Sequence, residues 1–212
     1  GSNPDHIVLG NTLTNDGFSG QQFDYLLANP PYGVDWKGYQ QPIVDEHNKL
    51  GFKGRFGPGL PRVSDGSLLF LLHMISKMKP VKDDPGTPWV DGGSRIGIVL
   101  SGSPLFSGGA GSGESEIRRW MLESDLVEGI VALPDQMFYN TGINTYIWIL
   151  TNRKATDAVD TVRLVDAREL GTKMRKSLGD KRKELTKTAV DEITRLYTEG
   201  LDDAGGDSRV KV

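Results

Sequence analysis

Asn29, Pro30, Pro31 and Tyr32 are residues whose types and spacing suit one kind of chemistry. Two successive prolines fix φ at about −65° and remove two backbone N–H donors, so the segment is stiff and rich in acceptors. The amide oxygen of Asn29 and a backbone carbonyl oxygen beside it match the two hydrogens of a planar NH2 group. The ring of Tyr32 offers a flat face for stacking. The segment therefore points to the binding of an amino group on a flat ring, with the nitrogen lone pair facing an electrophile.

The residues before this segment predict how it is positioned. The apolar run Tyr25–Ala28 is typical of a buried strand, so we expect Asn29 at the end of a strand. A bare Asn-Pro-Pro more often marks a polyproline-like turn than a binding site. The preceding strand and the aromatic residue that follows shift the balance toward the binding site.

The composition limits the class of protein. The 212 residues suit one large domain or one domain with an appendage, and the net charge of −3 is unlike that of a stand-alone DNA binder. A DNA substrate would therefore need a partner for much of its phosphate contact. The absence of cysteine excludes disulfides and thiolate metal sites, and three histidines give a zinc site little support, so we expect no metal. The sequence has no membrane-spanning run and no visible signal peptide, and we expect a cytoplasmic protein.

The hydrophobic pattern predicts an α/β sheet with an antiparallel strand pair at its end. We expect strands over Phe23–Asn29, Arg95–Ser101, Leu126–Leu133, Thr145–Leu150 and Val162–Val165. Helices are expected over Ser67–Met78, Glu114–Leu122 and, as an amphipathic helix, Lys181–Tyr197. Residues 33–64, which are rich in glycine, predict a long loop, and loops of that length are usually functional or mobile.

The glycine-rich segment Gly108–Gly113 follows a predicted strand and precedes a predicted helix, as phosphate-binding loops do. Its spacing is G-x-G-x-G rather than G-x-G-x-x-G, and no acidic residue follows at the end of a neighbouring strand. We interpret the segment as a flexible connection, with a contact to DNA phosphates as the alternative.

Other candidate residues also have plainer interpretations. The segment from Asp65 to Ser67 precedes an apolar helix and suits either a helix cap or the wall of a cofactor pocket. His73 on that helix is expected to be a packing residue. Phe138 either packs on the edge of the sheet or forms a second aromatic wall opposite Tyr32. Residues 168–187 carry eight basic and three acidic residues, which suits a solvated helix face, a DNA-backbone contact or a subunit contact.

The segment Phe23–Gly33 resembles the catalytic motif of amino-methyltransferases that use S-adenosylmethionine, in which the motif follows the fourth strand of a Rossmann-like sheet. Several further segments match in order and spacing: Gly10–Leu13, Asp65–Pro80, Gly97–Phe106, Glu116–Leu122, Val127–Pro134, Met137–Leu150 and Val162–Arg168. Together they resemble the modification subunit of type I restriction-modification systems, a family of N6-adenine DNA methyltransferases. The stretch Gly129–Leu150, which includes Asn140 and Thr141, is the more diagnostic part.

The resemblance implies a role for each matching residue. Asn29 and the Pro30 carbonyl, stiffened by Pro31, would hold the adenine amino group, and Tyr32 would stack on the extruded adenine. Phe138 is the candidate for the opposite face. Ser67 and Asn11 are the candidate cofactor contacts, although the family usually has an aspartate at the second of these positions. The implied cofactor is S-adenosylmethionine, and the implied partners are DNA, a specificity subunit and a restriction subunit.

The resemblance also divides the chain. Residues 3–155 resemble the catalytic part of the methyltransferase domain, and residues 156–199 are expected to form a strand and a basic helical C-terminal segment. Residues 200–212, which begin with a Gly/Asp-rich run, are expected to form a mobile tail. The family's glycine-rich cofactor loop and its ribose-binding acidic residue would precede Asn29, where only 28 residues are present. We therefore expect a fragment that is inactive alone and binds the cofactor weakly.

Two other functions remain open at this point. An Asn-Pro-Pro-Tyr segment serves a glutamine side-chain amide or a guanine amino group equally well, although residues 65–150 favour the type I family. A non-catalytic module that binds a specificity subunit is the other alternative, and the basic C-terminal segment is its evidence.

Overall fold

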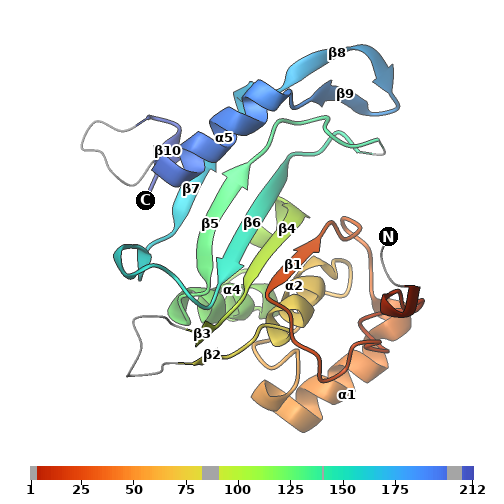
Figure 1. Ribbon diagram of the computed structural model, residues 1–212. Helices are drawn as coiled ribbons and strands as arrows, with labels where there is room; N and C mark the ends of the chain where they lie inside the picture. The colour runs from red at the N-terminus through yellow and green to blue at the C-terminus, as the bar shows by residue number, and fades with distance from the viewer. Residues whose placement is uncertain (1–3, 83–90, 140, 200–206) are drawn as a thin grey trace.

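The computed structural model describes residues 4–82, 91–139, 141–199 and 207–212. Its centre is a six-stranded sheet in the spatial order β1-β4-β6-β5-β7-β10, and two hairpins, β2–β3 and β8–β9, lie outside that sheet (Figure 1). The strands of the sheet are β1 (Tyr25–Ala28), β4 (Arg95–Ser101), β5 (Val127–Ala132), β6 (Thr145–Thr151), β7 (Arg163–Asp166) and β10 (Val210–Lys211). The hairpins are formed by β2 (Val81–Lys82) with β3 (Asp91–Gly92) and by β8 (Thr172–Leu178) with β9 (Lys181–Glu184).

The sheet mixes parallel and antiparallel pairs. Strand β1 runs parallel to β4, and β5 runs parallel to β7. Strand β6 lies between β4 and β5 and is antiparallel to both, and β10 is antiparallel to β7. The carboxyl ends of β1, β4, β5 and β7 therefore meet at one edge of the sheet, which is the usual place for a ligand in an open α/β sheet.

Helices cover both faces of this sheet (Figure 1). The α-helices are α1 (Gln40–Leu50), α2 (Ser67–Ser76), α3 (Ser103–Phe106), α4 (Gly113–Glu123) and α5 (Lys187–Glu199). Short 3-10 turns are η1 (Pro4–His6), η2 (Lys37–Tyr39), η3 (Gly51–Lys53), η4 (Thr156–Ala158) and η5 (Arg168–Leu170). The loop predicted over residues 33–64 thus contains a helix of 11 residues, α1. The hydrophobic pattern of α1 is weak because Ile43 is its only buried residue. Pro42 does not prevent the helix, because it lies in the first turn, where no N–H donor is needed.

Alternation along β6 explains why one sheet has two cores. Trp148 and Leu150 pack in a large cluster with residues of α2 and α4, such as Leu69 and Ile117. The intervening residues of β6 point to the other face, where a smaller cluster forms around Leu196 of α5. Side chains alternate between the faces of a strand, so each strand of the sheet centre is held from both sides.

Strand β1 is less buried than its apolar sequence predicts. Tyr25 and Leu27 are 77% and 86% exposed, whereas Leu26 and Ala28 pack on the large core. The reason is topological, because in the described part of the chain β1 pairs with β4 alone and forms the edge of the sheet.

The predicted helix over Lys181–Tyr197 is wrong in its first part. Lys181–Glu184 is strand β9, and the helix α5 begins only at Lys187, where the Thr186 hydroxyl accepts a hydrogen bond from the Ala189 N–H. Gly179, with φ of 63°, makes the tight turn between β8 and β9. Much of the predicted tail, residues 200–206, lies outside the described residues, but Val210–Lys211 pairs with β7.

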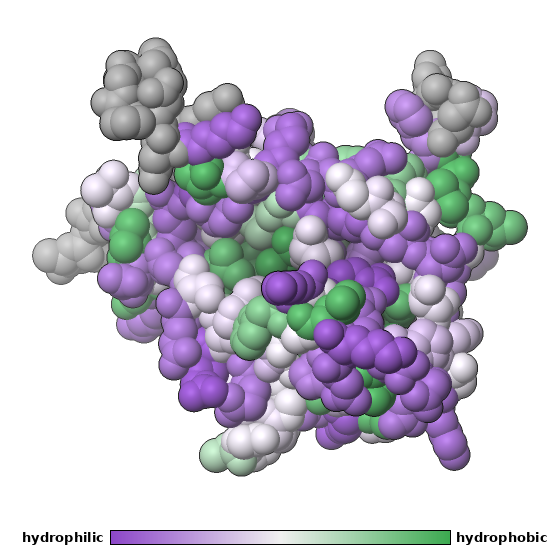
Figure 2. Space-filling model, turned by 90° about the horizontal axis from the view of Figure 1, so that it is seen from below, coloured by the Kyte–Doolittle hydropathy of each residue, from purple (hydrophilic) through white to green (hydrophobic). Residues whose placement is uncertain are grey.

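The face seen in Figure 2 is mostly hydrophilic, and its hydrophobic residues are divided among small groups. None of the helices in the described part of the chain has the length and apolar character that a membrane crossing requires.

His73 belongs to a polar cluster that ties α2 to the segments before it. Its Nδ1 lies 3.2 Å from Nη1 of Arg55, and its Nε2 lies 3.1 Å from the Thr12 hydroxyl. A guanidinium only donates, so Nδ1 must accept and His73 is neutral with its proton on Nε2. Burial, together with the charge of Arg55, lowers the pKa of His73 to about 4. The contacts agree with the packing role that the sequence predicts.

We expect this histidine to make the fold less stable below neutral pH. The pKa of His73 rises from about 4 in the folded state to its ordinary value on unfolding, so between these values the unfolded state binds more protons. Stability should rise with pH across this window and level off above it. His73→Asn should therefore reduce the slope of the free energy of unfolding against pH between pH 5 and 6.5. The reduction should be smaller than about 1.4 kcal/mol per pH unit, which is the limit for one titrating group.

Urea unfolding at each pH measures this effect, with His6→Asn as the control because His6 is an exposed histidine. Asp16 and Glu46, whose pKa values are lowered, contribute mainly at lower pH. An unchanged slope in His73→Asn would show that His73 is not the group that titrates.

Candidate active site

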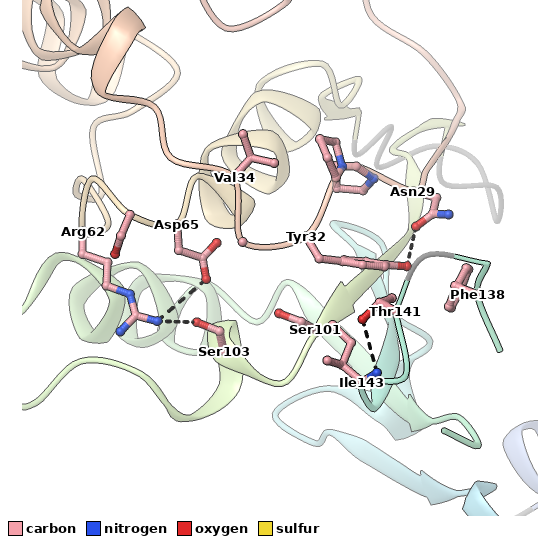
Figure 3. Close-up of a pocket in the computed structure, with 14 residues that line it drawn as sticks. Asn29, Tyr32, Val34, Arg62, Asp65, Ser101, Ser103, Phe138, Thr141 and Ile143 are labelled. Carbon is pink, nitrogen blue, oxygen red and sulfur yellow. Dashed lines mark hydrogen bonds and ion pairs between the residues drawn. The ribbon is translucent and has the colours of Figure 1, made fainter. Parts of the chain in front are cut away.

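A cavity of about 780 Å³ opens at the carboxyl ends of β1, β4 and β5 (Figure 3). The residues that line it come from the segments after these strands and from the loop before α2. They are Asn29, Pro30, Pro31, Tyr32, Gly33, Val34, Arg62, Ser64, Asp65, Ser101, Ser103, Phe138, Thr141 and Ile143. Its size suits a small molecule or one nucleotide. All four residues of the Asn-Pro-Pro-Tyr segment line the cavity, and so does Phe138 of the loop after β5.

Asn29 and Tyr32 are bonded to each other in this structure. The Tyr32 hydroxyl donates to the Asn29 Oδ1 at 2.6 Å (Figure 3). Burial raises the pKa of Tyr32 to about 12, although the Asn29 contact acts in the opposite direction, so the hydroxyl keeps its proton at neutral pH. The Oδ1 of the exposed Asn29 side chain therefore accepts a hydrogen bond from the Tyr32 hydroxyl, which a donor on a ligand can replace.

Tyr32 and Phe138 form an aromatic pair in the cavity wall. Their ring centroids are 5.6 Å apart and the ring planes make an angle of 73°. The edge of one ring meets the face of the other, so a flat ligand does not fit between them in this arrangement. Stacking on Tyr32 requires the two rings to separate or the ligand to cover one face only.

The opposite wall of the cavity is polar. Nη2 of Arg62 donates to the hydroxyls of Ser103 and Ser107 at 2.9 and 3.1 Å, and lies 3.9 Å from Asp65 (Figure 3). Burial alone would raise the pKa of Asp65, but hydrogen bonds from Ser103 and Ser67 and the charge of Arg62 bring this pKa below its usual range. The wall thus presents an ionised, buried carboxylate beside a half-exposed guanidinium.

The two predicted cofactor contacts do not line this cavity in the described part of the chain. The Asn11 Oδ1 accepts from the backbone N–H of Leu13 and closes a turn. Ser67 is buried, and its hydroxyl and N–H donate to the Asp65 Oδ1 at 2.6 and 3.0 Å. Ser67 therefore orients a carboxylate that does line the cavity, and its own contact with a cofactor stays a prediction.

Sequence reasoning missed Arg62 and Ser103 as cavity residues. They are 41 positions apart, one in the loop before α2 and one at the start of α3. Arg62 lies outside the segments that match the family, and Ser103 lies inside Gly97–Phe106, where its residue type alone does not mark it as a cavity residue. The one available signal was that residues 33–64 form a long connection next to the predicted site, which is where binding residues gather.

The glycine-rich segment connects α3 to α4 and is anchored to α4 at its first residues, while a contact to DNA phosphates stays a prediction. Arg118 of α4 donates to the carbonyl oxygens of Pro104, Ser107 and Gly108, and the Ser112 hydroxyl caps α4 by accepting from the Ser115 N–H. Among the described residues, no group of three acidic or histidine side chains is placed to hold a metal ion.

Residues 1–210 match the family described as N-6 DNA Methylase. The methylase subunit of the type I restriction enzyme MjaIX from Methanocaldococcus jannaschii is 26% identical over 198 residues, which cover 93% of this chain and 32% of that protein. The HindI methylase subunit from Haemophilus influenzae is 28% identical over 151 residues, covering 71% of this chain and 29% of that protein. The chain thus spans about a third of the length of such relatives.

Solved structures give the same result for the fold. A type I restriction-modification methyltransferase subunit from Streptococcus thermophilus superposes with a TM-score of 0.70 at 25% identity, over 94% of this chain and 36% of that one. The M protein of EcoKI superposes with a TM-score of 0.58 at 23% identity, over 90% of this chain and 33% of that one. These matches confirm the α/β, Rossmann-like methyltransferase fold that the sequence predicts.

Proposed function

Because the chain belongs to the N-6 DNA Methylase family, we propose that it carries the target-adenine part of the active site of a type I modification methyltransferase. The observation that carries the proposal is the position of Asn29 and Tyr32. Both follow β1 at the carboxyl edge of the sheet and line a cavity of about 780 Å³ together with Phe138. The substrate would be the N6 amino group of an adenine extruded from duplex DNA.

The chemistry of Asn29 in this proposal is that of an acceptor. Its Oδ1 and the Pro30 carbonyl oxygen accept hydrogen bonds from the two N–H groups of the amino group. The nitrogen lone pair is then directed at the methyl donor. A bound methyl donor would supply the electrophilic carbon to this lone pair, and the proton that the methylated amino group loses would pass to water. Asn29 holds the nucleophile in place and is not itself a base.

Tyr32 has two roles in the proposed reaction. Its hydroxyl donates a hydrogen bond to the Asn29 Oδ1 in this structure and would have to give way when the amino group arrives. Its ring then stacks on the adenine, and Phe138 covers the other side after the present edge-to-face contact opens. The exchange would replace one hydrogen bond to Asn29 by another, so the acceptor of Asn29 stays satisfied when the site opens.

S-adenosylmethionine is the cofactor in this proposal and supplies the electrophilic methyl group when it is bound. The polar wall of the cavity fits its charged end, because Asp65 is an ionised, buried carboxylate whose Oδ1 accepts hydrogen bonds from Ser67. Asp65 would hold the ammonium group or the ribose hydroxyls. Weak cofactor binding by the 212-residue chain alone, and a contact from Asn11, stay predictions.

Partners and location belong to the same proposal. The relatives are named methylase subunits of type I restriction enzymes, which supports DNA, a specificity subunit and a restriction subunit as partners. A cytoplasmic location, where the DNA is accessible, follows from that role.

Methyl transfer by the whole protein with its partner subunits tests the proposal. After incubation with duplex DNA and methyl-labelled S-adenosylmethionine, digestion of the DNA should release the label as N6-methyladenine. Label found on guanine, on cytosine or on protein glutamine would show that the substrate is another planar amino group and not adenine.

A further inference from the structure

The hairpin of β8 and β9 concentrates positive charge, although the whole chain has a net charge of −3. Between residues 172 and 184 there are two acidic residues, Asp180 and Glu184, and six basic ones: Lys173, Arg175, Lys176, Lys181, Arg182 and Lys183. Lys173, Arg175, Lys176 and Arg182 are exposed, and within the described part of the chain none of these four forms an ion pair. Lys183 pairs with Asp135.

The register of the hairpin brings like charges together. Lys173 lies directly opposite Lys183 on the neighbouring strand. Like charges at opposed positions destabilise an antiparallel pair, so this arrangement does not serve the stability of the hairpin itself. Asp135 offsets the charge of Lys183 but not that of Lys173 or of the exposed Arg175 and Lys176. An anionic partner would neutralise these remaining charges, which favours a binding role over a merely solvated surface.

The hairpin is fixed to the loop that forms one wall of the cavity. The carbonyl oxygen of Gln136 accepts from the N–H groups of Arg182 and Lys183 at 3.0 and 3.2 Å, and the carbonyl oxygen of Tyr139 accepts from the Asp180 N–H at 3.0 Å. The ammonium group of Lys181 lies 5.2 Å from the centre of the Tyr139 ring. Phe138, between these two anchor residues, lines the cavity.

These contacts place the charge at the edge of the sheet where the site opens. Figure 1 shows the hairpin beside the loop that joins β5 to β6, at the end of the molecule to which β1 also points. A nucleotide extruded into the cavity keeps its backbone connections, so phosphates on both sides of it stay near the cavity mouth. Exposed, unpaired lysine and arginine side chains are the groups that bind such phosphates without reading sequence.

We propose that the β8–β9 hairpin binds the phosphate backbone of the DNA whose adenine enters the cavity; this rests on the proposed function. The hairpin positions the duplex and takes no part in the methyl transfer itself. The hairpin is attached to the loop that contains Phe138, so phosphate binding and base binding take place next to each other. DNA bound to the hairpin would therefore have its target base close to the aromatic wall of the cavity.

The test replaces the three basic residues of β8 by glutamine, as Lys173→Gln, Arg175→Gln and Lys176→Gln in one variant of the whole protein. These side chains are exposed, and the backbone contacts to the cavity loop come from other residues, so the fold should be unchanged. The control variant carries Lys37→Gln, Lys49→Gln and Lys53→Gln, which remove the same charge from exposed positions around α1, at the other end of the molecule in Figure 1.

Fluorescence anisotropy with a labelled duplex, repeated at several salt concentrations, measures affinity and its salt dependence. We expect the β8 variant to bind about tenfold or more weakly. Its plot of log K against log salt should be shallower by about two to three units, since each phosphate that a side chain neutralises adds about 0.9 to the slope. The Michaelis constant for DNA should rise while kcat at saturating DNA stays near the wild-type value. The control variant should match the wild type.

Two results would overturn the inference. One is an unchanged salt slope in the β8 variant, while the unaltered protein methylates adenine normally. The other is an unchanged slope together with loss of the specificity subunit on gel filtration, which would make the hairpin a subunit contact. A β8 variant that loses DNA affinity in a protein that never methylates adenine would leave the hairpin as a DNA-binding element and reject the proposed reaction instead.

Discussion

Asn29→Ala is expected to abolish methyl transfer in the whole protein while leaving its fold intact. The side chain of Asn29 is exposed at the cavity, and its described hydrogen bond is the one from the Tyr32 hydroxyl, so its removal creates no buried unpaired group. The amino group would lose the acceptor that fixes its position, and misplacement of a reacting group costs on the order of 100-fold or more in rate. Single-turnover transfer of labelled methyl groups to duplex DNA measures the effect.

The matched control is Asn48→Ala, which removes an exposed asparagine side chain from α1. DNA affinity should be close to that of the wild type in both variants, because most contacts to DNA go to its backbone and Asn29 would contribute only one hydrogen bond to the target base. Transfer by Asn29→Ala at a rate near the wild-type value would exclude the role assigned to the amide oxygen, whatever its effect on stability.

The sequence predicts the frame of this site well because each part of it is local. A polar segment after an apolar strand, as at Asn29, places the segment at the end of that strand whatever the rest of the sheet does. The strands over Arg95–Ser101 and the β5 and β6 regions were found for the same reason, since their apolar runs are short, β-branched and bounded by polar turns. The cavity forms where these strand ends meet.

What the sequence did not predict depends on contacts between distant segments. Arg62 reaches Ser103 and Ser107 across more than 40 positions, and no local pattern marks such a pair. The exposure of Tyr25 follows from the position of β1 at the sheet edge, which an apolar run cannot reveal. Composition also misleads in the basic segment, because the residues of Lys181–Glu184 favour a helix. Pairing with β8 and the backbone bonds to the Gln136 carbonyl hold them in a strand instead.

Tyr32→Phe is expected to be much milder than Tyr32→Ala. The phenylalanine keeps the ring on which we propose that the adenine stacks, and base–aromatic stacking is worth about 1–3 kcal/mol. Tyr32→Ala removes that energy, which corresponds to a fall of roughly 5- to 150-fold in kcat/KM. Kinetics of methyl transfer at varied DNA concentration measure the two variants, with Tyr39→Ala as the control because Tyr39 is also partly exposed but lies next to α1.

The structure makes the phenylalanine variant more informative than a simple test of stacking. The Tyr32 hydroxyl donates to the Asn29 Oδ1 at 2.6 Å, so under the proposed function it would compete with the adenine amino group for that acceptor. Removing it takes away a competing hydrogen bond worth about 0.5–1.5 kcal/mol, and Tyr32→Phe should therefore bind the target base as well as the wild type or slightly better. If phenylalanine proves as damaging as alanine, the hydroxyl rather than the ring carries the function, and Tyr32 would have to act on the amino group directly instead of releasing Asn29 to do so.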